Sequence, residues 1–190
     1  MQNALILNQA DNVAVARAAI AAGAGAWNDV TALTWSPDSP VTAAELGCEV
    51  VLMHMRGEHR TMQQAPRYDD VVGEVCAYLE ARAIAAIGAG VARDRIWLDP
   101  GIGFGKTLKH NLALIAHLDQ IIALGFPVLL GASRKSFLAK IDPSATDAAD
   151  RLGGSLAVAL AGARAGVAAV RVHDVRETVQ ALAVQSAIDA

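Results

Sequence analysis

The stretch "RIWLDPGIGFGKT", residues 95–107, places an apolar strand before a polar residue and a glycine-rich turn, and a helical segment follows it. It is similar to the phosphate-binding loop G-x-x-x-x-G-K-[ST], but Pro100 stands where that pattern needs its first glycine. A proline has no N–H to offer a phosphate, whereas an Asp-Pro-Gly turn presents the carboxylate of Asp99 at the strand end. The stretch therefore predicts a βα unit whose functional residue is Asp99, with Lys106 on the outer face of the loop.

The same alternation of a short apolar strand and an alanine-rich helix recurs along the chain. Hydrophobic residues make up 54% and aromatic residues only 4% of the sequence, so the core must be built from small aliphatic side chains, as in alternating α/β proteins. Gly23, Gly47 and Gly166 follow helical patterns, as C-cap glycines do. The expected strands are 4–7, 25–30, 49–55, 95–100, 126–132 and 168–174, and the expected helices are 11–23, 41–46, 69–88, 109–124, 134–140 with 146–165, and 174–188.

Two architectures fit apolar strands that are separated by helices, because both contain a parallel sheet covered by helices. A doubly wound sheet would carry a glycine fingerprint after its first strand, and none stands there. In a (β/α)₈ barrel the functional residues lie at the carboxyl ends of the strands. The polar residues at the expected strand ends are Asn28, Asp29, His54, Asp99, Ser133 to Lys135, Arg171 and His173. We therefore predict a barrel of this type.

The chain length predicts that the barrel is incomplete. A (β/α)₈ barrel of about 250 residues spends about 31 residues on each βα unit. The 190 residues of this chain then hold about six units. Since the chain opens on a strand and its last helix reaches the C-terminus, we expect residues 1–190 to form one domain that lacks the first two units.

Charge and cysteine usage narrow the classes of function. The 16 basic and 19 acidic residues give a net charge of −3 without a basic run, which argues against nucleic acid or an anionic membrane as the partner. Cys48 and Cys76 have no metal-ligand spacing, and His54 and His59 lack a third ligand. The sequence has neither an apolar run long enough to span a bilayer nor the start of a signal peptide. We expect a cytoplasmic protein that acts on small molecules.

Three of the polar residues together suit a flat heterocycle. Asp99 can accept two parallel hydrogen bonds from an N–H/NH₂ edge, Asn28 can donate and accept, and Lys135 can donate to a ring nitrogen or carbonyl. This set fits a ring of guanine or pterin type. In the alternative interpretation, Asp99 and Asn28 only shape the turns that follow their strands.

The motif "LLGASRKSFL", residues 129–138, indicates an anion site. Ser133 or Ser136 can begin a helix whose free N–H groups favour an anion, and Arg134 and Lys135 add positive charge beside it. Such a place receives a carboxylate or a phosphate. A solvated basic helix start is the alternative interpretation.

The motif "VRVHD", residues 170–174, ends the last expected strand with two more candidate ligands for an anion. Arg171 and His173 alternate onto one side of that strand. An inward arginine at a strand end is costly unless it is paired. We therefore expect an anionic ligand at Arg171.

Taken together, the motifs resemble dihydropteroate synthase from about residue 13 to the C-terminus. They are "NDV" (28–30), "VLMHMRG" (51–57), "TMQQAPRYDDVVGEV" (61–75), "LDPGIGFGKTLKHNLALI" (98–115), "LLGASRKSFL" (129–138), "DRLGGSLA" (150–157) and "VRVHDVRETVQAL" (170–182). That family has a (β/α)₈ barrel fold and makes dihydropteroate, a folate precursor, from dihydropterin hydroxymethyl diphosphate and p-aminobenzoate. The resemblance implies a transferase of folate biosynthesis.

The resemblance also implies a role for each candidate residue. The residues that it assigns to substrates are Asn28, Asp99 and Lys135 for the pterin, Phe104 and Ser136 for p-aminobenzoate, and Arg171 and His173 for the diphosphate. Asp99 and Lys135 would also be catalytic, because they would spread developing charge into the pterin ring. The family further implies Mg²⁺ and a homodimer formed through helices on the C-terminal side.

The first part of the sequence departs from the family pattern. Loops of "NVTPDSF" and "GGESTRPG" type are missing from it, and with them the asparagine that ligates Mg²⁺. The family's third strand ends in "DT", whose aspartate binds the pterin, whereas counting back from Asn28 places Gln9 and Ala10 there. Three functions stay open: a synthase, a degenerate non-catalytic pterin-binding homologue or partner subunit, and a pterin-binding methyltransferase domain. "SRKS" and "RVHD" favour the synthase.

Overall fold

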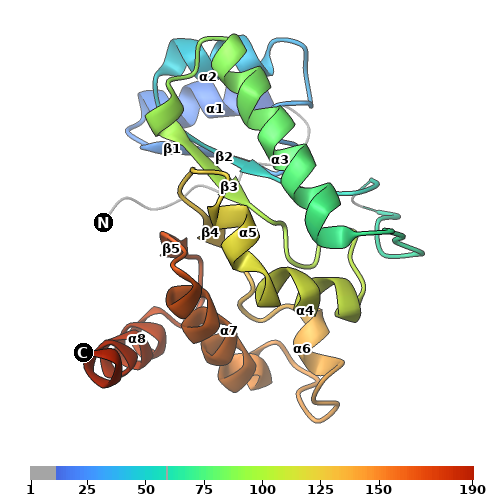
Figure 1. The fold of residues 1–190 in the computed structure, drawn as a ribbon. Coiled ribbons are helices and arrows are strands. Elements are labelled where there is room, and N and C mark those ends of the chain that lie inside the picture. Colours follow the sequence, from blue (N-terminus) through green and yellow to red (C-terminus); the bar gives the residue numbers. More distant parts are fainter. Residues whose placement is uncertain (1–11, 59) are drawn as a thin grey trace.

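Five parallel strands follow one another in chain order in the computed structural model, as a three-stranded and a two-stranded sheet (Figure 1). The structure describes residues 12–58 and 60–190. The expected strand 4–7, Gln9, Ala10 and His59 lie outside the described residues. The strands are β1 (Ala26–Asp29), β2 (Glu49–Met53), β3 (Ile96–Asp99), β4 (Leu129–Leu130) and β5 (Ala169–Val170).

The strand order is that of a barrel. β1, β2 and β3 pair in parallel, β4 pairs in parallel with β5, and a parallel bridge between Leu98 and Val128 joins the two groups. Each strand therefore lies beside the one before it in the chain, whereas a doubly wound sheet changes direction at a switch point. Among the described residues, β1 and β5 are the edges of this arc.

Helices follow the strands in the expected rhythm. They are α1 (Asn12–Ala21), α2 (Ser39–Leu46), α3 (Val71–Gly88), α4 (Leu108–Ala116), α5 (Leu118–Ile122), α6 (Ser136–Ala139), α7 (Leu152–Ala165) and α8 (Val175–Asp189), with 3₁₀ turns at Arg93–Arg95 and Ala149–Arg151. The expected helix 109–124 is two helices, because His117 has φ −121° and ψ 37°. α7 packs on β5, and α8 lies beside α7 at the end of the arc that is remote from β1 (Figure 1).

The two faces of the sheet have different roles. Val50, Leu52, Ile96 and Leu98 are completely buried on the face that the helices cover, where α3 packs on β2. The register pairs Asn28 with Val51 and Val51 with Trp97, and it pairs Met53 with Asp99. Since side chains alternate along a strand, Asn28 and Asp99 lie on the opposite face, which a barrel turns inward.

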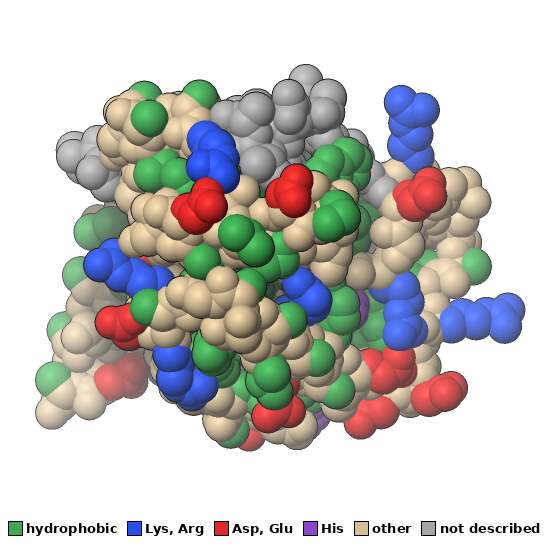
Figure 2. All heavy atoms as spheres, turned by 90° about the horizontal axis from the view of Figure 1, so that it is seen from above, with side chains coloured by type: hydrophobic (Ala, Val, Ile, Leu, Met, Phe, Trp, Pro, Cys, Tyr) green, Lys and Arg blue, Asp and Glu red, His purple; other side chains and the backbone are tan. Residues whose placement is uncertain are grey.

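The described surface carries mixed charge. On the face shown in Figure 2, basic and acidic side chains are interspersed among apolar ones. None of the helices within residues 12–58 and 60–190 has the length and apolar character that a bilayer crossing needs.

Candidate active site at the carboxyl ends of the strands

Asp99 lies at the end of β3 and is only 2% exposed. Its Oδ1 accepts a hydrogen bond from the Gly101 amide at 2.7 Å, so the carboxylate does shape the turn that follows the strand. Burial raises the pKa of the Asp99 carboxyl, although the Gly101 amide and the charges of Arg171, Lys135 and Lys106 act in the opposite direction. A buried carboxylate thus stands among three cationic side chains.

Asn28 and Asp29 face opposite sides of β1. Asp29 is 1% exposed, and its carboxylate accepts hydrogen bonds from the Thr31 amide (2.8 Å), the Thr31 hydroxyl (2.7 Å) and the Leu33 amide (3.0 Å). Asp29 is therefore a turn-forming residue, and we do not assign it to the site. Asn28 is exposed on the inner face of the sheet.

Lys135 contacts the Phe104 ring and interacts electrostatically with Asp99 and Arg171. Its Nζ is 4.1 Å from the centre of the Phe104 ring, a cation–π contact. Burial lowers the pKa of Lys135, and so does the positive charge of Arg171, while Asp99 raises it. The strand ends of β3, β4 and β5 therefore bring Asp99, Phe104, Lys135 and Arg171 into one region.

The helix α6 begins at Ser136, one of the two residues expected to begin it, but no serine caps it. Lys135 is the N-cap and makes no side-chain cap hydrogen bond. The Ser133 hydroxyl instead accepts a hydrogen bond from the His173 amide at 3.2 Å and contacts His173 Nδ1 at 3.1 Å. Ser136 is exposed. Because α6 has only four residues, its dipole is a weak source of anion affinity.

The prediction for Arg134 is also wrong. Its guanidinium does not add free charge to an anion site, because Nε and Nη2 donate to Asp174 at 3.1 Å and 2.5 Å. Arg134 has φ 59°, a left-handed conformation that is strained for a residue with a side chain. Its amide donates to the Ser155 hydroxyl at 2.9 Å, which helps to hold this conformation.

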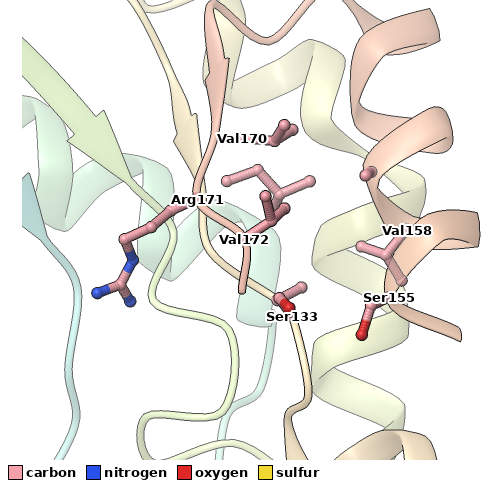
Figure 3. A pocket seen from close by; sticks show the side chains of 9 residues that line it. Ser133, Ser155, Val158, Val170, Arg171 and Val172 are labelled. Carbon is pink, nitrogen blue, oxygen red and sulfur yellow. The ribbon is translucent and has the colours of Figure 1, made fainter. Parts of the chain in front are cut away.

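Arg171 follows β5 and points away from the helices. Figure 3 shows its guanidinium on the opposite side of the chain from Val172, Ser155 and Val158. A Cβ on Gly131 would come within 3.2 Å of the guanidinium, so the glycine makes room for it. No carboxylate of residues 12–58 or 60–190 lies within 4.0 Å of this arginine. The pocket on the other side, behind Ser133, holds only about 10 Å³, too little for an organic ligand.

Lys106 contradicts the prediction that it lies on the outer face of its loop. The side chain is 2% exposed, and burial lowers its pKa to about 7. Nζ donates to the carbonyl oxygens of Gly101 and Phe104, each at 3.0 Å, and it contacts His54 Nδ1 at 2.9 Å. A lysine with these partners is not available to a nucleotide phosphate, which supports the rejection of the phosphate-loop interpretation.

The segment after β2 covers the glycine-rich loop, an arrangement that no pattern in the sequence indicated. The Tyr68 hydroxyl donates to the Gly105 carbonyl at 3.0 Å, and the Gln63 side chain donates to the Gly103 carbonyl. The Arg56 guanidinium lies 4.0 Å above the Tyr68 ring and donates to Glu74 at 2.5 Å. These contacts fix the loop from the side that faces solvent.

The described residues do not assemble a metal site. No group of three His, Cys, Asp or Glu side chains within residues 12–58 and 60–190 could hold a metal ion. His54 is buried, and burial together with the charge of Lys106 lowers its pKa to about 3, which keeps the imidazole neutral for its contact with Nζ.

Comparisons with a family model and with known proteins identify the same family. Residues 10–173 match the model of the pterin binding enzyme family. The dihydropteroate synthase of Neisseria meningitidis serogroup B is 48% identical over 164 residues, which are 85% of this chain and 57% of that protein. The dihydropteroate synthase of Escherichia coli K12 is 43% identical over 176 residues, or 91% of this chain and 60% of that protein. The chain thus spans about three-fifths of the length of these relatives.

Solved structures give the same result for the fold. The dihydropteroate synthase of Xanthomonas albilineans, solved with 4-aminobenzoic acid, superimposes with a TM-score of 0.87 at 45% identity, over 94% of this chain and 62% of that one. The synthase of Thermus thermophilus in complex with 6HMPPP gives a TM-score of 0.87 at 45% identity, over 94% of this chain and 70% of that one. The predicted barrel type is confirmed.

Proposed function

Since this chain belongs to the pterin binding enzyme family, we propose that it acts as a dihydropteroate synthase-type transferase of folate biosynthesis. In that reaction the C–O bond between the methylene carbon and the diphosphate of dihydropterin hydroxymethyl diphosphate breaks, and pyrophosphate leaves. The amine nitrogen of p-aminobenzoate bonds to the same carbon and releases a proton. The products are dihydropteroate and pyrophosphate.

The observation that carries this proposal is the environment of Asp99. One carboxylate oxygen accepts from the Gly101 amide, and within residues 12–58 and 60–190 no other donor bonds to this side chain. The remaining acceptor capacity faces the inner side of the sheet, beside Lys135. A pterin can donate from its N–H/NH₂ edge to that carboxylate while Lys135 donates to a ring nitrogen or carbonyl. Asn28 would complete the recognition of the ring.

Asp99 and Lys135 would also act on the transition state. As pyrophosphate departs, positive charge develops at the methylene carbon and spreads into the pterin ring. A carboxylate that is already in place and excluded from water stabilises such charge more than solvent does. Burial keeps the pKa of Lys135 below its ordinary value, so its proton can be shared with a ring atom at a lower cost.

The other assigned residues would bind the second substrate and the leaving group. The Phe104 ring offers an apolar face to the aromatic ring of p-aminobenzoate, and the exposed Ser136 hydroxyl can donate to its carboxylate. Arg171 and His173 would hold the diphosphate. Arg171 suits this role because its guanidinium has no carboxylate partner among the described residues.

We further propose the domain organisation, location and assembly of the chain. Residues 1–190 would form one pterin-binding unit that corresponds to barrel units three to eight. The protein would be a homodimer in the cytoplasm. Support for an interface comes from α8, where Val175, Val179, Val184 and Ile188 are each more than half exposed. Mg²⁺ would be held mainly by diphosphate oxygens of the substrate, because it keeps few protein ligands in such sites.

A non-catalytic pterin-binding homologue is the second candidate. It is favoured by Gln9 and Ala10, which stand in the sequence where the resemblance expects Asp and Thr. Incorporation of labelled p-aminobenzoate into dihydropteroate distinguishes the two functions. We expect weak or no turnover by the chain alone and recovery when the N-terminal segment of a relative is joined to it. If the joined protein binds pterin but stays inactive, the synthase proposal is wrong and the second candidate holds.

A further inference from the structure

Lys106 is a charged side chain in the interior that the proposed reaction does not use. Its Nζ lies 3.0 Å from the carbonyl oxygens of Gly101 and Phe104, 3.3 Å from that of His54, and 2.9 Å from His54 Nδ1. We call these three carbonyl oxygens and one ring nitrogen the ammonium cage. A lysine ammonium has three donors and no acceptor, so a cage of acceptors matches its charged form.

The ammonium cage joins two segments that lie far apart in the sequence. His54 follows β2, whereas Gly101 and Phe104 belong to the loop after β3. The backbones of these segments touch: a Cβ on Gly101 would lie 1.9 Å from the His54 carbonyl oxygen, and a Cβ on Gly105 would lie 2.2 Å from that of Arg56. Carbonyl oxygens that point to one place repel each other, and a positive charge between them removes the repulsion.

The loop that the ammonium cage holds carries much of the proposed substrate site. The Gly101 amide donates to Asp99, and the Gly101 carbonyl accepts from both Lys106 and the Phe104 amide. The Phe104 carbonyl is a cage atom, and the Phe104 ring lies under Lys135. A change in the cage would therefore move Asp99, Phe104 and Lys135 relative to one another.

We propose that Lys106 is a positioning residue, whose ammonium acts as an internal cation that holds the loop after β3 in the conformation in which Asp99, Phe104 and Lys135 meet. Which ligands those three residues bind depends on the proposed function, whereas the conformation of the loop is independent of it. The alternative is that Lys106 contributes only volume to the interior. The two possibilities differ in whether a neutral group of the same size can replace the side chain.

Chemical rescue of the full chain tests this difference. Lys106→Ala removes three carbons and the ammonium, which are the heavy atoms of n-propylammonium. At pH 6, below the lowered pKa of Lys106, and without additive, we expect the hydrogen-bonded amides of Gly103 and Phe104 to exchange about 10- to 100-fold faster than in the unmodified chain, because the charge-assisted hydrogen bonds of Lys106 are lost. n-Propylammonium should restore slow exchange, and 1-propanol should not. Equal rescue by both, or rescue by neither, would overturn the proposal.

Two further variants make the test complete. Lys106→Met keeps the volume without the charge, so exchange in the loop should be as fast as in Lys106→Ala; slow exchange in the methionine variant would mean that volume alone suffices. Lys109→Ala removes an exposed lysine of the adjacent helix and should leave the loop unchanged. If neither Lys106 variant folds, the same criterion applies to folding: n-propylammonium and not 1-propanol must restore it in Lys106→Ala.

Pterin titration separates this inference from the proposed function. If the unmodified chain binds pterin, Lys106→Met should weaken binding, whereas Lys109→Ala should leave it unchanged. If neither the unmodified chain nor the joined protein binds pterin, the proposed function fails, and the exchange and rescue results still decide the role of Lys106.

Discussion

Replacing Asp99 with asparagine should separate ligand binding from folding. Asparagine keeps a side-chain oxygen that can accept the hydrogen bond of the Gly101 amide. In the unmodified chain this amide lies 2.7 Å from the Asp99 carboxylate. Asparagine has no negative charge with which to accept hydrogen bonds from the N–H/NH₂ edge of a pterin. Its NH₂ group is a donor and would face the donors of that edge. Hydrogen bonds to charged groups contribute about 1.5–3 kcal/mol. The dissociation constant for a pterin should therefore rise about 10- to 150-fold.

The same variant should not lose stability. Burial raises the folded-state pKa of Asp99 above 3.8. A raised carboxyl pKa means that this group favours the folded state most at low pH, and that this contribution is lost as pH rises through the folded pKa. At pH 7 the charged form therefore opposes folding, and Asp99→Asn should unfold at the same temperature as the unmodified chain or at a higher one.

Isothermal titration with 6-hydroxymethylpterin and thermal unfolding at pH 7 measure the two effects. Asp29→Asn is the matched control, because Asp29 is equally buried but serves only the turn after β1. It should lower the unfolding temperature and leave the pterin affinity unchanged. If Asp99→Asn binds pterin within about twofold of the unmodified chain, or if Asp29→Asn weakens binding equally, our assignment of Asp99 is refuted.

Three other perturbations have definite expected outcomes. Burial lowers the pKa of Lys106 from 10.5 to about 7, so above pH 7 the unfolded chain binds more protons than the folded chain. The free energy of unfolding should therefore rise between pH 7 and about 8.5. Urea titrations should show this slope, and Lys106→Met should reduce it. Arg134→Gly should retain about 1 kcal/mol more stability than Arg134→Ala in the same titrations, because both lose the contact with Asp174 but only glycine relieves φ 59°; equal stabilities would contradict backbone strain at this position. Gly101→Ala should abolish pterin binding in calorimetry, because its Cβ would lie 1.9 Å from a carbonyl oxygen, whereas Gly153→Ala in α7 meets nothing within 4 Å and should bind normally.

The local part of the fold could be predicted from the sequence. Runs of apolar residues locate the strands, because both faces of each strand are covered or face the barrel interior. Glycines locate helix ends: Gly47 and Gly166 cap α2 and α7 with φ 58° and 94°. Polar residues at strand ends predict a candidate site, because parallel strands end at the same rim. The break at His117 was not predicted, and α6 is shorter than the expected helix 134–140.

The pairing of charges could not be predicted, because it depends on contacts between distant segments. Lys106 meets His54 across 52 residues, and Arg134 meets Asp174 across 40. From the sequence alone, a lysine next to a glycine turn is expected to be solvent-exposed, because the carbonyl oxygens that accept its hydrogen bonds cannot be identified. Gly101 and Gly105 were the available signal, since each has a positive φ and lies against the backbone of the segment after β2.

A crystal structure of the chain with bound 6-hydroxymethylpterin tests the central claim most directly. We predict that the N–H/NH₂ edge of the ring lies about 3 Å from the Asp99 carboxylate, that Lys135 Nζ donates to the ring, and that Asn28 lies at its rim. The Gly101 amide would still donate to Asp99. A pterin bound at any other place, or bound here with Asp99 and Lys135 out of hydrogen-bond distance, would contradict the account.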